Sequence, residues 1–309
     1  MALISTTSFG ELDEVEIQRY LKRVNKPAVK SIKSPDGDII DCVDMYKQPV
    51  FDHPLMKNHT IRYAIIQSKN VAKYVGAEAN LNLWKPHVAH AEEFSLAQMW
   101  LIANGESTTD LNSIEVGWQA YPRLYGDDNP RLFIFWTSKS YRNGCYNLQC
   151  EGFVQKSSIT VVGAALEQVS TYNVQMAYLF VIVKKDFTSG DWWLIINGTP
   201  VGYWPRALFT SLQNFAERVD FGGEIVNAKF IAGEHTETAM GSGHYSWEGY
   251  GKACSMDQIH VYDERDIMTE PYITNIFMTN RHCYDLYAGT NNLGTYIFFG
   301  GPGRNVNCQ

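Results

Sequence analysis

The sequence predicts an all-β protein: a two-sheet antiparallel β-sandwich preceded by an N-terminal prosegment or linker that contains a short helix. The composition, with 13% aromatic residues, 24 glycines and only 19% charged residues, favours packed strands joined by tight turns. From Tyr63 onward, apolar segments of strand length alternate with turn signals. Many such strands within about 250 residues indicate two packed sheets.

The N-terminal part has a different pattern. Residues 11–24 place their apolar side chains close to one helical face, which predicts a short amphipathic helix. Residues 25–59 contain recurring prolines and no sustained apolar period. We therefore expect an N-terminal segment over residues 1–62 and a β domain over residues 63–309.

Strands and hairpins follow in the second part. Residues 81–84, 132–136 and 192–196 are apolar runs of strand length. The segments that flank residues 186–191 and those that flank Asn197-Gly198 have the pattern of β-hairpins, because Asn-Gly suits a two-residue turn. These pairs predict antiparallel sheets.

Charge and apolar run lengths exclude two classes of partner. The formal net charge is −7, and Lys and Arg form no stripe that could follow a phosphate backbone, so we expect no nucleic acid. The longest apolar runs, such as residues 176–183, are too short to cross a bilayer as helices, so no membrane span is predicted. Residues 1–5 run quickly into acidic residues and lack the pattern of a secretion signal.

Six cysteines are present. The spacing of Cys145 and Cys150 fits neither a zinc site nor a redox motif and predicts a short disulfide loop. Cys283 and Cys308 bracket the C-terminal strand and could close a second loop. Two further cysteines have no obvious partner: Cys42 and Cys254. Disulfides would place the protein in an oxidising compartment.

Residues 114–121 alternate with a period of two. One strand face carries Ile114, Val116, Trp118 and Ala120, and the other carries Glu115, Gly117, Gln119 and Tyr121. The second face can form the floor of a cleft, where Gly117 leaves room for close approach. A solvent-facing strand explains the same pattern, because an unpaired glutamate is seldom buried.

Two other stretches are candidates for a functional site. Gly222-Gly223 precede Glu224, which indicates either close backbone approach or a bulge with a solvated glutamate beyond it. Residues 240–251 contain His244 and Tyr245 among glycines and aromatics. This stretch is either a substrate-facing loop or a connection whose rings fill the edge of the core.

Other chemistries lack their motifs. No G-x-S-x-G sequence is present, and the glycine-rich stretches lack the spacing of a phosphate loop. H-E-x-x-H is also absent. We therefore assign no metal and no cofactor.

Several strings resemble one family, the plant neprosin-domain proteins. Residues 30–42 and 51–55 resemble the activation segment of that family. The strings that resemble its catalytic domain occur in the family's order: residues 114–122, 144–155, 201–205, 222–225, 241–244 and 298–303. The long connector that family members usually carry between these two parts is nearly absent here, near residues 62 and 63.

The resemblance implies a secreted zymogen with a β-sandwich catalytic domain. It further implies a glutamic peptidase that cuts proline-containing peptides or proteins after proline at acidic pH. The catalytic glutamates match Glu115 and Glu224, and a prosegment over residues 1–62 could occlude the cleft. Extracellular location follows from the resemblance, and the sequons at Asn58 and Asn197 would then be glycosylation sites.

Two carboxyls can hydrolyse a peptide without metal or covalent nucleophile, one as base and one as acid. Around the pair, the candidate substrate-binding residues are Gln119, Tyr121, Trp204, Gly222, Gly223, His244 and Tyr245. We expect Gln119 to help stabilise the oxyanion, because it shares a strand face with Glu115. Two alternatives stay open: a carbohydrate-active or carbohydrate-binding sandwich, and a catalytically inactive one.

Overall fold

The computed structural model describes residues 28–33, 39–43, 60–69, 72–104, 110–228 and 234–309. The chain forms two compact units, Met1–His59 and Thr60–Gln309. In the first unit, β1 (Ala28–Lys33) and β2 (Ile39–Val43) pair as antiparallel strands. The helix predicted over residues 11–24 lies outside the described residues. No helix among the described residues is long and apolar enough to cross a membrane.

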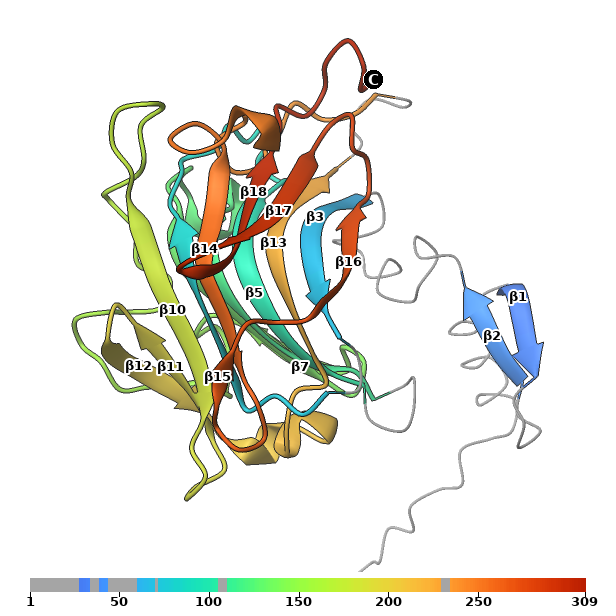
Figure 1. The fold of residues 1–309 in the computed structure, drawn as a ribbon, viewed down its shortest axis with the longest axis vertical. Helices are drawn as coiled ribbons and strands as arrows, with labels where there is room; N and C mark the ends of the chain where they lie inside the picture. Colours follow the sequence, from blue (N-terminus) through green and yellow to red (C-terminus); the bar gives the residue numbers. More distant parts are fainter. Residues whose placement is uncertain (1–27, 34–38, 44–59, 70–71, 105–109, 229–233) are drawn as a thin grey trace, which may run out of the picture. The chain divides into compact units, whose positions relative to one another are not determined.

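The second unit, called here the sandwich domain, consists of two antiparallel sheets (Figure 1). The seven-stranded sheet has the order β16 (Ile273–Met278), β3 (Thr60–Ser68), β13 (Arg218–Asn227), β5 (Ser95–Ala103), β6 (Asn112–Ala120), β7 (Arg131–Ser138) and β8 (Asn143–Tyr146). The predicted all-β sandwich is therefore confirmed.

The nine-stranded sheet packs against the first one. Its order is β17 (Asp285–Asn291), β18 (Gly294–Gly300), β14 (Cys254–Tyr262), β4 (Gly76–Asn82), β10 (Tyr178–Lys185), β11 (Trp192–Ile196), β12 (Thr199–Trp204) and β9 (Val154–Gln155), with β15 (Met268–Thr269) paired to β14. Both predicted hairpins are present, because β11 pairs with β10 before it and with β12 after it. The helical elements described in this domain are short: α2 (Pro122–Tyr125), η3 (Arg206–Leu208), η4 (Ser211–Gln213) and η5 (Ser246–Glu248).

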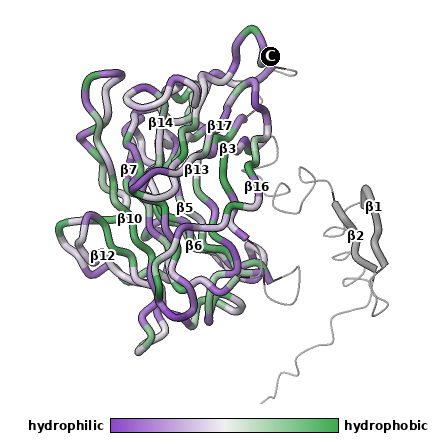
Figure 2. The backbone as a smooth tube through the Cα atoms, viewed as in Figure 1, coloured by the Kyte–Doolittle hydropathy of each residue, from purple (hydrophilic) through white to green (hydrophobic). Residues whose placement is uncertain are grey.

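The core lies between the sheets and follows the strand period of two. Ile114, Val116 and Trp118 of β6 all point into it, as their alternation predicts, and all three are fully buried. Figure 2 shows hydrophobic residues concentrated along strands such as β3 and β5, with hydrophilic residues gathered in connecting loops. Burial of this apolar surface is the main stabilising contribution to the fold.

Two disulfides are present in the sandwich domain. Cys145 is bonded to Cys150 beside β8, and Cys283 is bonded to Cys308 near the C-terminus. Cys254 is a free, buried cysteine. Both expected disulfide loops therefore occur, and the longer one fixes the C-terminal segment to the residues that precede β17.

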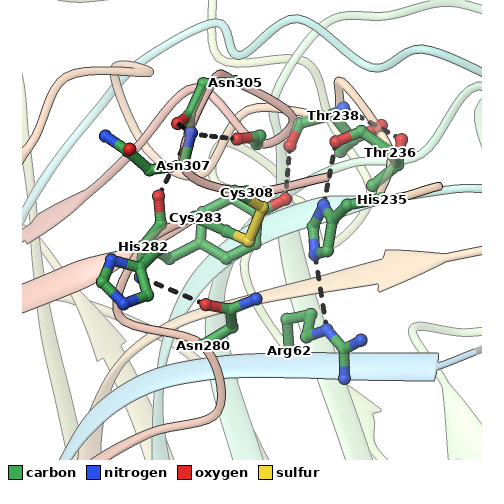
Figure 3. The surroundings of a disulfide bond; sticks show 12 residues. Arg62, His235, Thr236, Thr238, Asn280, His282, Cys283, Asn305, Asn307 and Cys308 are labelled. Carbon is green, nitrogen blue, oxygen red and sulfur yellow. Dashed lines mark hydrogen bonds between the residues drawn. A yellow bond between two sulfur atoms is a disulfide. The ribbon is translucent and has the colours of Figure 1, made fainter.

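The surroundings of the second disulfide are polar on one side (Figure 3). His235 is buried next to the two sulfurs and accepts a hydrogen bond at Nε2 from Arg62 Nε at 3.3 Å. The ring nitrogen and the two sulfurs lie within 4.8 Å of one another. Both sulfurs are bonded in the disulfide, however, so neither is a thiolate that could ligate a metal ion.

Candidate active site

The two glutamates of interest lie on the outer face of the seven-stranded sheet, which faces away from the core. Residues of β3, β5, β7 and β13 form a second apolar cluster on this face. Glu115 and Glu224 are only 9% and 7% exposed within it. Carboxyls seldom have so little contact with water unless they are paired or functional.

Strand register brings the two glutamates towards one residue, Gln98 of β5. Gln98 pairs with Gly117 of β6 on one side and with Gly222 of β13 on the other. Glu115 is two residues before Gly117, and Glu224 is two residues after Gly222. The two glutamates are therefore diagonal neighbours of Gln98. Long side chains in such positions can reach one another across the strands.

Both glutamate side chains are hydrogen-bonded to Gln98. Gln98 Nε2 donates to Glu115 Oε2 at 3.2 Å and to Glu224 Oε2 at 3.4 Å. Because both bonds start from one nitrogen, the two oxygens lie no further apart than the sum of these distances. Glu115 has a further donor, since Ser113 Oγ donates to its Oε1 at 2.8 Å.

Burial shifts the ionisation of both carboxyls in the same direction. Loss of solvation raises the pKa of Glu115 to about 7, although hydrogen bonds from Ser113, Gln98 and Trp100 oppose the rise. Burial also raises the pKa of Glu224 well above its usual range, and the nearby charge of Glu115 raises it further. When the pair holds one proton, we therefore expect the proton on Glu224.

Aromatic rings stand on both sides of the pair. On the β3 side, the ring of Tyr63 packs against Trp100 at 6.5 Å and against Phe277 at 6.2 Å. On the β8 side, the ring of Tyr146 packs against Phe135 at 4.7 Å and against Phe133 at 5.6 Å. The site is thus a polar centre between two ring surfaces.

The phenols of Tyr63 and Tyr146 are close enough to interact with the pair. Burial raises the pKa of each phenol well above its usual range, and the charges of Glu224 and Glu115 raise it further. Both phenols therefore stay protonated wherever the carboxyls titrate.

Three of the predicted substrate-binding residues lie on the same side of the sheet as the pair. Gln119 belongs to β6, but its Oε1 accepts from Tyr125 Oη at 3.2 Å, and its Nε2 is buried without a partner among the described residues. Tyr121 packs edge-on against Phe94 of the second apolar cluster at 5.5 Å. Gly222, as described above, is the β13 neighbour of Gln98.

Other predicted residues are placed elsewhere. Trp204 is fully buried in the core between the sheets and packs against Phe153, so it cannot line a pocket on the outer face. Gly223 faces the core, where a Cβ would lie 2.6 Å from Phe299. The pair Gly222-Gly223 also forms no turn, because β13 continues through it without a bulge.

The loop of His244 and Tyr245 contacts a different set of residues. His244 Nδ1 lies 3.0 Å from Glu248 Oε1, and Tyr245 Oη donates to the backbone oxygen of His282 at 2.7 Å. The 3-10 helix of this loop contacts β17 and β18 of the nine-stranded sheet. Its described contacts therefore lie away from the glutamates.

The sequon at Asn197 lies in the exposed turn between β11 and β12. Asn58 lies outside the described residues.

Fold and site together define a class: a β-sandwich with two buried glutamates on the outer face of one sheet, both hydrogen-bonded to the side-chain amide of one glutamine. The Neprosin family model matches residues 91–302, and the Neprosin activation peptide model matches residues 31–111. The chain belongs to the Neprosin family. This membership and the glutamate pair support a hydrolase of the glutamic peptidase type.

Solved structures with a similar arrangement include a scytalido-glutamic peptidase bound to a peptide-based transition state analogue. It is 10% identical, with a TM-score of 0.37, over 79% of this chain and all of the other. SCP-B, an Eqolisin-family peptidase in complex with the tripeptide Ala-Ile-His, is 9% identical with a TM-score of 0.39. The match covers 79% of this chain and all of SCP-B. CG-16, an agglutinin from chicken liver, is 8% identical with a TM-score of 0.26, over 52% of this chain and 92% of the agglutinin. Similarity this low carries no argument about activity.

Proposed function

We propose that this protein is a glutamic endopeptidase that cleaves peptide bonds after proline, with Glu115 as general base and Glu224 as general acid. The observation that carries the proposal is the shared hydrogen-bond donor, Gln98 Nε2, which holds the two buried carboxyls together. Peptide hydrolysis without metal or covalent intermediate needs two such groups, one of each protonation state.

The roles follow from the surroundings of each carboxyl. Glu115 accepts hydrogen bonds from Ser113 and Gln98, which stabilise its ionised form, whereas Gln98 is the side chain that stabilises ionised Glu224. Glu115 takes a proton from water as the water oxygen bonds to the scissile carbonyl carbon. The proton of Glu224 passes to the leaving nitrogen as the C–N bond breaks. Transfer of the proton from Glu115 back to Glu224 through solvent restores the pair.

Cleavage at acidic pH is part of the proposal. A peptide can reach the carboxyls only if the site opens, since they are 9% and 7% exposed. Contact with water lowers the pKa of a carboxyl that burial has raised. The two carboxyls titrate as a coupled pair. The pair therefore holds a single proton at a lower pH when the site is open than when it is closed.

Preference for proline is supported by the ring surfaces around the pair. The pyrrolidine ring is rigid and apolar, and the proline nitrogen has no hydrogen that would need a partner. A site walled by Tyr63, Trp100 and Tyr146 offers such a ring flat aromatic contacts.

The N-terminal match supports regulation by a prosegment. The activation peptide model covers residues 31–111, and we propose that residues 1–62 limit access to the pair before maturation. Two disulfides suit an oxidising compartment, which supports an extracellular protein with glycosylation at Asn197.

The proposal is tested with two peptides that differ only in proline or alanine before the scissile bond. The purified full chain is incubated with each at several pH values, and mass spectrometry follows both peptide cleavage and processing of the chain. We expect cleavage after proline at acidic pH and cleavage of the alanine peptide that is at least about tenfold slower, as expected for a lost pocket contact. A Glu224→Gln preparation reveals contaminating peptidases.

Equal cleavage of both peptides would reject the proline preference and leave the peptidase assignment intact. Failure of the processed chain to cleave either peptide at any pH would reject the peptidase assignment.

A further inference from the structure

We propose that Gln98 is a third member of the catalytic centre: its amide nitrogen positions both carboxyls, and its amide oxygen orients the hydrolytic water. This inference rests on the peptidase function proposed above and adds a residue that the glutamate pair alone does not include. Its basis is the geometry of one buried amide group and of the two glycines that flank it.

The orientation of the Gln98 amide is fixed by its neighbours. Nε2 has two hydrogens, and it lies 3.2 Å from a Glu115 oxygen and 3.4 Å from a Glu224 oxygen. The opposite orientation would set the amide oxygen against both carboxyls and repel whichever one is ionised. The amide nitrogen therefore faces the pair whenever the pair carries a charge.

The amide oxygen of Gln98 has no hydrogen-bond partner among the described residues, although the residue is only 1% exposed. A buried acceptor without a donor is unfavourable, and a bound water molecule or a catalytic role can account for it. Oε1 belongs to the same planar amide as Nε2, so it lies beside both carboxyls. A water molecule held there can donate one hydrogen to Oε1 and the other to Glu115, which leaves a lone pair for the substrate carbonyl.

The residues directly opposite Gln98 on both neighbouring strands are glycines. A Cβ on Gly117 would lie 1.9 Å from the backbone oxygen of Ala97 and 2.7 Å from Gln98 Cα. A Cβ on Gly222 would lie 2.2 Å from the backbone oxygen of Ala64, and Gly222 has a φ of 147° that side chains rarely adopt. Both direct neighbours of Gln98 must therefore be glycine, so neither places a side chain beside its amide.

In the reaction, Gln98 stays unchanged. The water oxygen bonds to the carbonyl carbon, one water proton moves to Glu115, and the other remains on the new hydroxyl while it is hydrogen-bonded to Oε1. The amide N–H groups stay on the carboxyl oxygens throughout. Gln98 thus contributes position rather than a proton.

The test compares Gln98→Met with a matched control, Gln67→Met. Gln67 lies on the same sheet face in β3, and its amide contacts Asp220 at 3.1 Å and Asn275 at 2.7 Å. We expect Gln98→Met to lower kcat by about 10²–10³-fold with little change in KM, the range seen when one positioned hydrogen-bond group is removed. We expect Gln67→Met to keep kcat close to that of the unmodified protein.

A second readout separates positioning from a merely structural role. An ionised carboxyl that loses a donor has a higher pKa, so the pH–rate profile of Gln98→Met should move to higher pH. The carboxyl stretching bands, followed by infrared spectroscopy against pH, should move in the same direction without any substrate. Gln98→Asn keeps the amide but is one methylene too short to reach both glutamates, and it serves if Gln98→Met does not fold.

The outcomes distinguish this inference from the proposed function. A Gln98→Met enzyme with an unchanged kcat and pH profile would overturn the inference, while an inactive Glu115→Gln enzyme in the same assay still supports the glutamate pair. If the unmodified protein cleaves no peptide, the proposed function fails and the water-orienting role fails with it. The infrared titration then decides the positioning role, which an unchanged carboxyl pKa would also overturn.

Discussion

The central strands of the seven-stranded sheet bury side chains on both faces, but the two faces are chemically opposite. On the inner face, Trp118 and Phe221 are fully buried among other apolar side chains. On the outer face, Glu115, Glu224 and Gln98 are 9%, 7% and 1% exposed. The same strands, β5, β6 and β13, supply both faces.

The difference shows where stability and function reside in this sheet. Apolar burial on the inner face stabilises the fold, whereas burial of carboxyls disfavours their charged form and costs stability at neutral pH. The outer face retains these groups even though apolar residues would fill the space more favourably. Such a local cost is typical of a site maintained for chemistry.

The largest expected effect on stability belongs to the inner face. Phe221→Ala removes a fully buried ring and leaves a cavity, which should lower the free energy of unfolding by about 3–5 kcal/mol. Phe187→Ala is the control, since this ring is 61% exposed and its loss should change stability by less than about 0.5 kcal/mol. Urea unfolding measures both, and equal effects would contradict the assignment of the inner face as the core.

A smaller effect of opposite sign is expected on the outer face. Glu224→Gln should raise the free energy of unfolding at pH 7, because the glutamine needs no proton to remain buried. The folded-state pKa of Glu224 is raised. Its contribution to stability is therefore fully present below the unfolded-state pKa and is lost as the pH rises towards the folded-state value.

The same variant measured at pH 4 is its own control. Glu224 is protonated there in the folded protein, so the gain should shrink. A Glu224→Gln protein that is less stable than the unmodified protein at pH 7 would show that burial of this carboxyl does not lower the free energy of unfolding.

The sequence predicts much of the difference between the two faces, because successive side chains of a strand point to opposite faces of the sheet. The alternation over residues 114–121 separates Ile114, Val116 and Trp118 from Glu115, and the structure confirms that separation. The Asn-Gly turn between β11 and β12 is predictable for an equally local reason. Only the family resemblance predicts that Glu115 and Glu224 form a pair, since neither glutamate differs locally from a solvated one.

Features that depend on strand register could not be predicted. Gln98 lies within β5, Ser95–Ala103, an almost wholly apolar run in which every residue is buried. Its importance arises only when β6 and β13 place Gly117 and Gly222 beside it. The one local signal is a polar amide inside an apolar strand, and that signal does not specify a partner.

The placement of aromatic residues was partly wrong for the same reason. Trp204 lies between Tyr203 and Pro205 in a recognisable string, but the string does not say that its side chain faces the core. Tyr63, Trp100 and Tyr146, which do surround the pair, belong to three strands that are distant in sequence. Only tertiary pairing brings their rings together.

The most direct test of the central claim compares three glutamate variants in one peptidase assay. Glu115→Gln and Glu224→Gln remove the members of the pair, and Glu78→Gln alters a buried glutamate of the nine-stranded sheet that contacts His260 and Tyr262. We predict that either variant of the pair lowers kcat/KM at least about 10³-fold, since each removes an acid or base required in every turnover. We predict that Glu78→Gln stays near the unmodified rate. Full activity in Glu115→Gln or Glu224→Gln would contradict the account.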